Sequence, residues 1–231
     1  MSIVLGLDGS TADAAVAVTR DGDVVREEQA GPGASGRPRH SELLLASVER
    51  CVEEAGGWAA IDLVAVGAGP GSFTGLRIGI ATARALAQAR RLPLVAPSSL
   101  AALARGMAEG ADGPAPLLAV TDARRSEVFA ALYEPGGAEL WAPLVAAPER
   151  LAERLEALGA TPLAAGDGAL RFRQQLEAVG AAVLPQRDPA HRIAARHVCG
   201  LGEEMAPGAP AGIEPTYLRA PDAEKWLKRD R

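Results

Sequence analysis

One pattern occurs twice in this chain: an apolar strand that ends in aspartate, a turn, and two further strands. The first copy consists of residues 3–8, 14–18 and 23–28. The second copy, more than a hundred residues later, consists of residues 117–122, 128–133 and 138–145. Self-similarity at a long period indicates a duplicated architecture. The pattern therefore predicts an α/β protein of two subdomains, each with a mixed sheet that begins as an antiparallel hairpin and has flanking helices.

Helices and short strands follow each copy. Helical spacing of apolar residues predicts helices over 41–56 and 74–91, and Thr74 is the expected cap of the second. Strands are expected at 63–67 and 92–96, and a further helix begins after Ser98 or Ser99. In the second half we expect elements at 148–159, 162–168, 169–180 and 195–205.

The Gly- and Pro-rich stretch 110–116 is typical of a linker. We therefore expect an N-terminal subdomain over 1–109 and a C-terminal subdomain over 117–231. The final segment is expected to pack back on the first subdomain. The basic end of the chain, 224–231, is expected to be a solvated end or to touch tRNA within a larger complex.

Composition excludes several classes of function. The net charge of the 231-residue chain is −5 and aromatic residues make up 3% of it, so it is poorly suited to bind nucleic acid by itself. No uninterrupted apolar stretch reaches the roughly 18 residues of a membrane span, and no signal peptide is evident. Cys51 and Cys199 lack a pairing framework, which favours a reducing, cytoplasmic location.

The stretch "AGPGSFTGLRIGIA", residues 68–81, has the composition of a phosphate-binding loop but fits none of the known spacings. It lacks the Lys of the Walker loop, the last Gly of the dinucleotide fingerprint, and the Gly pair of the nucleophile elbow. A tight strand-to-helix turn is favoured, with anion binding at the helix start as the alternative.

Each copy of the repeated pattern ends its first strand in an Asp, and such paired turns can grip metal and phosphate from two sides. The first turn, "DGST", has the Gly that backbone approach to phosphate requires, whereas the second, "DARR", has side chains there. Candidate remnants of phosphate-binding loops are Asp8, Ser10, Thr11 and Asp122. The alternative for Asp122 is a turn residue that caps its own backbone or forms an ion pair with Arg124 or Arg125.

Metal and covalent chemistry have little support. The three histidines, His40, His191 and His197, form neither H-x-x-x-H nor H-E-x-x-H, and neither cysteine lies in C-x-x-C. We assign no catalytic residue and no metal ligand to this chain.

Several motifs together resemble the TsaB family, also called YeaZ. They are "GLDGST", "HSELLLASVE", "VAVGAGPGSFTGLRIGIATARALA", "PSSLAALA", "VTDARRSEVFAALY" and "EPTYLRAPDAEKW". The resemblance spans nearly the whole chain. It implies two actin-like subdomains of the ASKHA, ribonuclease H-like type, in agreement with the duplication.

The resemblance also implies a function. Members of the family help bacteria to make threonylcarbamoyladenosine beside the anticodon of tRNAs that read codons beginning with adenine. They act as the non-catalytic paralogue and partner of TsaD, together with the ATPase TsaE. We therefore expect a scaffold subunit without a bound cofactor, with ATP and metal on the partners. It would form a homodimer when alone and would meet tRNA only through the complex.

The metal-binding H-x-x-x-H of TsaD-type enzymes would fall on Ser99 and Leu103 here, which cannot replace imidazole. This departure implies that the chain itself is inactive. The alternatives are an actin-fold kinase of a small metabolite and a peptidase-like metallohydrolase, which ATP turnover or stoichiometric metal would favour.

In the helix over 74–91, small residues recur every four positions and form a smooth ridge. The family pairs TsaB with TsaD through its N-terminal helices, so the expected partner interface comprises Leu44, Leu45, Val48, Val52, Gly75, Leu76, Gly79, Ile80, Ala83 and Ala87. The alternative is that the ridge packs on the protein's own sheet.

Overall fold

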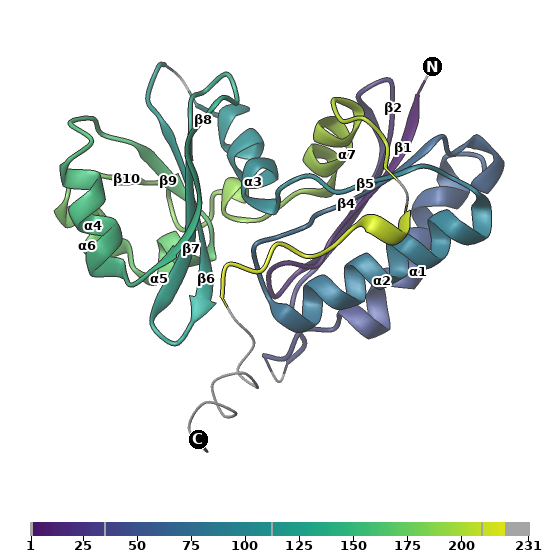
Figure 1. Ribbon diagram of the computed structural model, residues 1–231, viewed down its shortest axis with the longest axis horizontal. Coiled ribbons are helices and arrows are strands. Elements are labelled where there is room, and N and C mark those ends of the chain that lie inside the picture. Colours follow the sequence, from purple (N-terminus) through teal and green to yellow (C-terminus); the bar gives the residue numbers. More distant parts are fainter. Residues whose placement is uncertain (1, 35, 112, 209, 220–231) are drawn as a thin grey trace.

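The computed structural model of the protein describes residues 2–34, 36–111, 113–208 and 210–219. Two five-stranded sheets lie side by side, with helices on their faces and between them (Figure 1). The basic end 224–231 lies outside the described residues.

The first sheet has the strand order β3-β2-β1-β4-β5. Its strands are β1 (Ile3–Asp8), β2 (Ala14–Arg20), β3 (Asp23–Ala30), β4 (Leu63–Val66) and β5 (Leu94–Val95). β1, β2 and β3 are antiparallel, whereas β4 and β5 continue the sheet in parallel from β1. All six residues of β1 are buried because helices cover both faces of the sheet at its centre.

The second sheet repeats this order as β8-β7-β6-β9-β10. Its strands are β6 (Leu117–Arg124), β7 (Glu127–Tyr133), β8 (Glu139–Ala146), β9 (Leu163–Ala165) and β10 (Ala182–Val183). The hairpin strands are again antiparallel, and β9 and β10 are parallel to β6. The predicted fold class, two α/β subdomains each with a mixed sheet, is confirmed.

Two long helices cover one face of the first sheet, α1 (His40–Glu54) and α2 (Phe73–Arg90). The prediction that Thr74 caps α2 is wrong. Ser72 is the cap, and its Oγ accepts a hydrogen bond from Gly75 N–H at 3.3 Å. Of the two expected candidates, Ser98 and Ser99, it is Ser98 that caps α3 (Ser99–Ala108).

The space between the sheets is filled by α3 and by α7 (Ala195–Glu203), as Figure 1 shows. Side chains of both helices and of both sheets form one buried cluster there. On the outer face of the second sheet lie α4 (Pro148–Glu156), α5 (Asp167–Arg171) and α6 (Arg173–Ala178). Short 3-10 turns are η1 (Trp58–Ala60), η2 (Pro189–His191) and η3 (Pro210–Gly212).

As expected, part of the final segment packs back on the first subdomain, which changes the boundary between the subdomains. A C-terminal subdomain of 117–231 includes α7, yet α7 packs on β1, β2 and β4 of the first sheet. The η3 turn then lies against α2. Residues 195–208 and 210–213 thus pack with the first subdomain, because the buried face of α7 matches the face of that sheet that α1 and α2 leave uncovered. None of the described helices is long and apolar enough to cross a membrane.

Candidate functional site at the interdomain cleft

A cavity of about 500 Å³ lies between the subdomains, where the two repeated turns face each other. Ser10 and Thr11 line it from the first turn, and Asp122 and Arg124 line it from the second. The start of α2 forms a third wall. The structure therefore brings three of the four predicted loop residues to one cleft and leaves Asp8 out of its lining.

Asp8 is buried, with 1% of its surface exposed. Its Oδ1 accepts hydrogen bonds from Ser10 N–H at 2.8 Å and from Ser10 Oγ at 2.6 Å, and its Oδ2 accepts one from Ser99 Oγ at 2.6 Å. Burial raises the pKa of the Asp8 carboxyl, against the opposing effect of these hydrogen bonds. The assignment of Asp8 to a remnant of a phosphate-binding loop stays a prediction; in this structure Ser10 and Ser99 bind the carboxyl, and it does not line the cavity.

The glycine-rich turn before α2 is packed against the first repeated turn. The N–H of Ser72 donates to the carbonyl oxygen of Ser10 at 2.6 Å, and the N–H of Gly69 donates to Ser99 Oγ at 3.1 Å. A Cβ at Gly71 would overlap the backbone of Ser10. These glycines therefore permit a close backbone approach, as the strand-to-helix turn interpretation requires, and two amides of the turn bind within the protein.

Asp122 is held by arginines. Its carboxylate accepts hydrogen bonds from Arg171 Nη1 at 2.8 and 2.9 Å, from Arg124 N–H at 2.8 Å and from Arg124 Nη1 at 3.3 Å. The predicted alternative, a turn residue that caps its own backbone and pairs with Arg124, describes this arrangement. No local signal in the sequence indicates Arg171, which α5 brings to Asp122 from 49 residues away.

The second turn also differs in its backbone. Arg124, Arg125 and Ser126 have φ of 62°, 54° and 57°, the left-handed region that favours glycine. A two-residue hairpin turn requires positive φ at its central residues, which explains Arg125 and Ser126, and Arg124 lies at a bulge of β6. Arginine side chains therefore line the cleft from the tip of the β6–β7 hairpin.

Residues that the sequence analysis weighed as metal ligands are held by other contacts. Ser99 is buried against Asp8, and Leu103 belongs to the core between the sheets. His40 Nε2 contacts the carbonyl oxygen of Asp13 at 2.9 Å, and His191 Nδ1 accepts Gly166 N–H at 3.1 Å. Within the described ranges, no group of three His, Cys, Asp or Glu residues is placed to hold a metal ion.

The predicted partner interface, which includes the ridge of small residues on α2, points into the protein. Nine of its ten residues are buried, namely Leu44, Val48, Val52, Gly75, Leu76, Gly79, Ile80, Ala83 and Ala87. Most of them pack with the side chains of β1, β2 and β4 in one cluster. Assignment of these residues to a partner contact is therefore wrong, and the alternative that the ridge packs on the protein's own sheet is correct. Leu45, which is 50% exposed, is the exception.

The outward face of α2 carries a second row of small residues, Ala81, Ala85 and Ala89, all exposed. Ile78 and Leu86 beside it are half-buried. This row also repeats every four residues, so the sequence alone could not tell which of the two rows faces the sheet.

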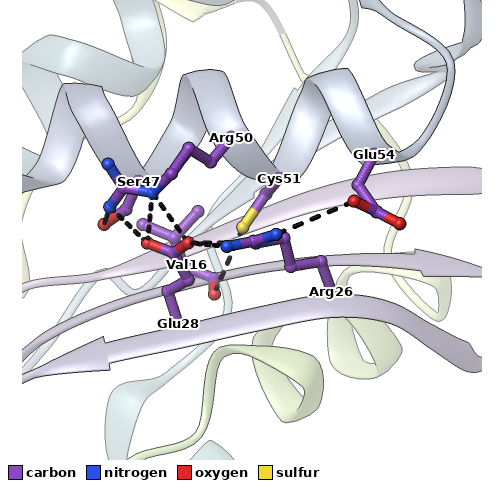
Figure 2. A network of polar contacts seen from close by, with 7 residues as sticks. All are labelled: Val16, Arg26, Glu28, Ser47, Arg50, Cys51 and Glu54. Carbon is purple, nitrogen blue, oxygen red and sulfur yellow. Dashed lines mark hydrogen bonds and ion pairs between the residues drawn. The ribbon is translucent and has the colours of Figure 1, made fainter.

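A polar network fixes α1 on β3 (Figure 2). Glu28 on β3 accepts hydrogen bonds from Arg50 Nη2 at 2.5 Å and from Arg26 Nη2 at 2.7 Å. The hydrogen bonds from Arg50 are the main cause that lowers the pKa of Glu28 to about 2. Arg50 also donates to Ser47 Oγ at 3.1 Å, so the network orients the helix that carries Leu45.

These features define a protein of the actin-like ASKHA fold, with two subdomains that enclose a cleft. Solved structures agree: an uncharacterized protein from Pseudomonas aeruginosa with similarity to peptidase YEAZ superposes with a TM-score of 0.78 at 31% identity, covering 95% of this chain and 100% of the other. The ROK hexokinase from Thermus thermophilus shares the fold, with a TM-score of 0.51 at 15% identity over 87% of this chain and 99% of the other.

Sequence comparison gives the family. The family model of TsaD, tRNA N6-adenosine threonylcarbamoyltransferase, matches residues 34–183. The TsaB proteins of Escherichia coli and Bacillus subtilis, both named tRNA threonylcarbamoyladenosine biosynthesis proteins, are 33% and 28% identical. The alignments cover 97% of both chains for the former and 99% of both for the latter. The chain belongs to the TsaB family, also called YeaZ.

Proposed function

We propose that this chain is a non-catalytic scaffold subunit that acts with TsaD and TsaE in threonylcarbamoyl transfer to tRNA. The modified base is the adenosine beside the anticodon of tRNAs that read codons beginning with adenine. This transfer takes place in the cytoplasm, and the partners bind ATP and metal.

The main support for a non-catalytic role is the set of contacts that hold two aspartates, Asp8 at the end of β1 and Asp122 near the end of β6. Asp8 is buried beneath Ser10 and Ser99, and Asp122 is held by Arg124 and Arg171. An actin-like kinase needs acidic groups that face a metal and phosphates across the cleft. Neither carboxylate is available for that role without a rearrangement, which favours a scaffold over a kinase.

The pairing surface follows from the burial pattern of α1 and α2. With the inner ridge buried, the outward faces remain, and they offer Leu45 on α1 and the row Ala81, Ala85 and Ala89 on α2. Small exposed residues allow another helix to approach closely, as an interface between helices requires. We assign this face to TsaD, or to a second copy of this chain when TsaD is absent.

Reconstitution tests the function. TsaD and TsaE of the same organism are incubated with tRNA, ATP and a threonylcarbamoyl donor, with and without this chain, and the chain is also incubated without them; modified adenosine is measured by mass spectrometry. We expect product only when this chain is present. Equal product without it would overturn the scaffold role, and product from this chain alone would overturn the inactive role.

A pair of variants tests the surface. Ala85→Arg places a long charged side chain on the outward face of α2 and should weaken binding to TsaD by ~100-fold or more. Ala157→Arg, at the exposed end of α4, is the matched control and should bind as the parent does. Size-exclusion chromatography gives the complex, and thermal melting shows that both variants are folded.

Affinity for tRNA should distinguish the isolated chain from its complex with TsaD. The net charge of −5 predicts weak binding of tRNA by the isolated chain near physiological salt. A filter-binding assay with the isolated chain, and then with the chain plus TsaD, should show retention only in the second case. Submicromolar affinity of the isolated chain would contradict contact through the complex alone.

A further inference from the structure

The segment after α7 runs from the first subdomain to the second. Residues 205–208 and 210–219, which we call the C-terminal strap, pass along α2 to the cleft (Figure 1). Four consecutive strap residues, from Thr216 to Arg219, line the cavity between the subdomains. The strap therefore closes one side of the cleft.

Backbone and arginine contacts hold the strap on the first subdomain. The carbonyl oxygens of Pro210 and Ile213 accept hydrogen bonds from the guanidinium of Arg84, the first at 3.0 Å. Further along, Thr216 N–H donates to the carbonyl oxygen of Ala68 at 2.8 Å. Arg84 lies on α2, so this helix is the main anchor of the strap.

A second anchor lies at the start of α2. Arg77 Nε donates to Tyr217 Oη at 3.0 Å, and the Arg77 guanidinium lies 3.8 Å from the centre of the Phe73 ring. The rings of Phe73 and Tyr217 are 5.3 Å apart, centre to centre. Contacts of an aromatic ring with another ring and with a cation each contribute to stability, so they fix the strap just before it reaches the second subdomain.

The end of the strap attaches to the β6–β7 hairpin. Arg219 Nη1 donates to the carbonyl oxygen of Ala123 at 3.1 Å, and its guanidinium forms an ion pair with Glu127. Other contacts between the subdomains include those of α3 and α7 in the shared core and the ion pair of Arg192 with Asp13. The attachment at Arg219 thus lies at the mouth of the cleft, and its loss leaves the core intact.

We propose that the C-terminal strap is a clasp that sets the opening of the interdomain cleft. With Arg219 on the hairpin, the two subdomains are held at one separation. Without that contact, the strap side of the cleft opens, while the α3–α7 core and the Arg192–Asp13 ion pair still join the subdomains. Arg77 and Arg84 connect the clasp to α2, so a partner that binds α2 also acts on the clasp; this last step rests on the proposed function.

Distance measurement between spin labels tests the clasp. Labels at Ala59→Cys and Ala157→Cys report on one subdomain each, and the native Cys51 and Cys199 are buried and stay unlabelled. In the parent we expect one narrow distance distribution. Arg219→Gln should shift the ratio of open to closed molecules by ~10-fold or more, the effect of one charge-assisted hydrogen bond.

Two further variants decide the interpretation. Arg84→Gln releases the strap from its other end and should give the same open population as Arg219→Gln. Arg150→Gln is the matched control, because Arg150 pairs with Glu153 within α4, and it should leave the distribution unchanged. Should Arg219→Gln fail to fold, Glu127→Gln removes the same ion pair from the hairpin side. A parent-like distribution in folded Arg219→Gln or Glu127→Gln would overturn the clasp.

Addition of TsaD tests the coupling. If TsaD binds α2 and loosens the clasp, the parent distribution moves toward that of Arg219→Gln. Binding without any change in the distribution would overturn the coupling and leave the clasp standing. Absence of binding would instead contradict the proposed function. It would not affect the clasp, because the measurements on the isolated chain test the clasp by themselves.

Discussion

The two repeated turns of this molecule have the same topology, but their aspartate side chains lie in different surroundings. Each has an Asp at or near the end of a central strand: Asp8 is the last residue of β1, and Asp122 lies two residues before the end of β6. Asp8 turns inward and accepts three hydrogen bonds from serine groups. Asp122 stays at the cleft, where Arg124 and Arg171 hold its carboxylate.

The difference teaches that a duplicated fold preserves strand order more strictly than it preserves the chemistry of its turns. Strand pairing depends on the buried faces of β1 and β6, which are alike. The position of each carboxylate depends instead on a distant partner, Ser99 in one half and Arg171 in the other. Changes at those partners alter the cleft without altering the sheets.

Truncation of the two aspartates tests this comparison most directly. Asp8→Ala leaves buried donors of Ser10 and Ser99 without an acceptor, and we expect a loss of about 2–4 kcal/mol in the free energy of unfolding. Asp122→Ala removes partly exposed contacts and should cost at most about 1 kcal/mol. Urea titration followed by circular dichroism measures both. Equal losses would show that the burial of Asp8 is not what separates the two turns.

Much of this fold could be predicted from the repeated pattern. Every end of the six hairpin strands lies within two residues of its predicted position, because alternation of apolar runs and turn residues is a local signal. Ser98 and Ser99 were both candidate caps of α3, and Ser98 is the cap. Thr74 was misassigned because Ser72 and Thr74 are both good caps, and only the backbone decides between them.

The orientation of side chains toward distant elements could not be predicted. Asp8 is buried because Ser99, 91 residues away, lies above it. The Gly75-to-Ala87 ridge indicates a close neighbour of α2 but not whether that neighbour is the chain's own sheet or a partner. The packing of α7 on the first sheet likewise depends on contacts between residues far apart in the sequence, and no local pattern indicates it.

Glycine-to-alanine variants of α2 test how closely this helix approaches the first turn. A Cβ at Gly75 would overlap the carbonyl oxygen of Gly9, so Gly75→Ala should destabilise the protein by about 1–3 kcal/mol. A Cβ at Gly79 would lie 3.8 Å from Gly9 N and 3.9 Å from Val66 Cγ2, which is ordinary contact. Gly79→Ala should therefore be neutral or stabilise by up to about 1 kcal/mol.

Thermal melting of the two variants is the measurement, with Gly79→Glu as a third. Because Gly79 is buried on the sheet, a charged side chain there should unfold the protein. A folded Gly79→Glu protein with a parent-like melting temperature would contradict the inward orientation of the ridge.

Acid should affect the outer hairpin strands of the two halves differently. The pKa of Glu28, which joins β3 to α1, is lowered to about 2, chiefly by hydrogen bonds from Arg50. An acid with a lowered pKa stabilises the fold above its unfolded pKa, and that contribution is lost as the pH falls from about 4.5 toward 2. In the second half, Arg154 of α4 lies 4.4 Å from the centre of the Trp141 ring of β8, a contact without a carboxylate.

Hydrogen exchange of the backbone amides, corrected for intrinsic rates, measures this contrast. Between pH 5 and pH 3 we expect β3 and α1 to lose protection before β8 and α4. Glu28→Gln should reduce the change in β3, whereas the exposed Glu53→Gln on α1 should behave as the parent. Simultaneous loss in both halves would show that the Glu28 network does not set the acid response.

The smallest expected effect concerns ATP. If the arginines of the second turn were the only obstacle to nucleotide binding, Arg124→Gly with Arg125→Gly would restore it, because glycine suits the positive φ of both positions. The first turn predicts otherwise, since the Asp8 carboxyl stays buried under Ser99 in that variant. We therefore expect ATP with Mg²⁺ to leave the melting temperature of parent and variant unchanged within about 1 °C, because a ligand stabilises only the state that it binds. Stabilisation of the variant alone would locate the defect in the second turn, and stabilisation of both would show that the buried Asp8 does not prevent binding.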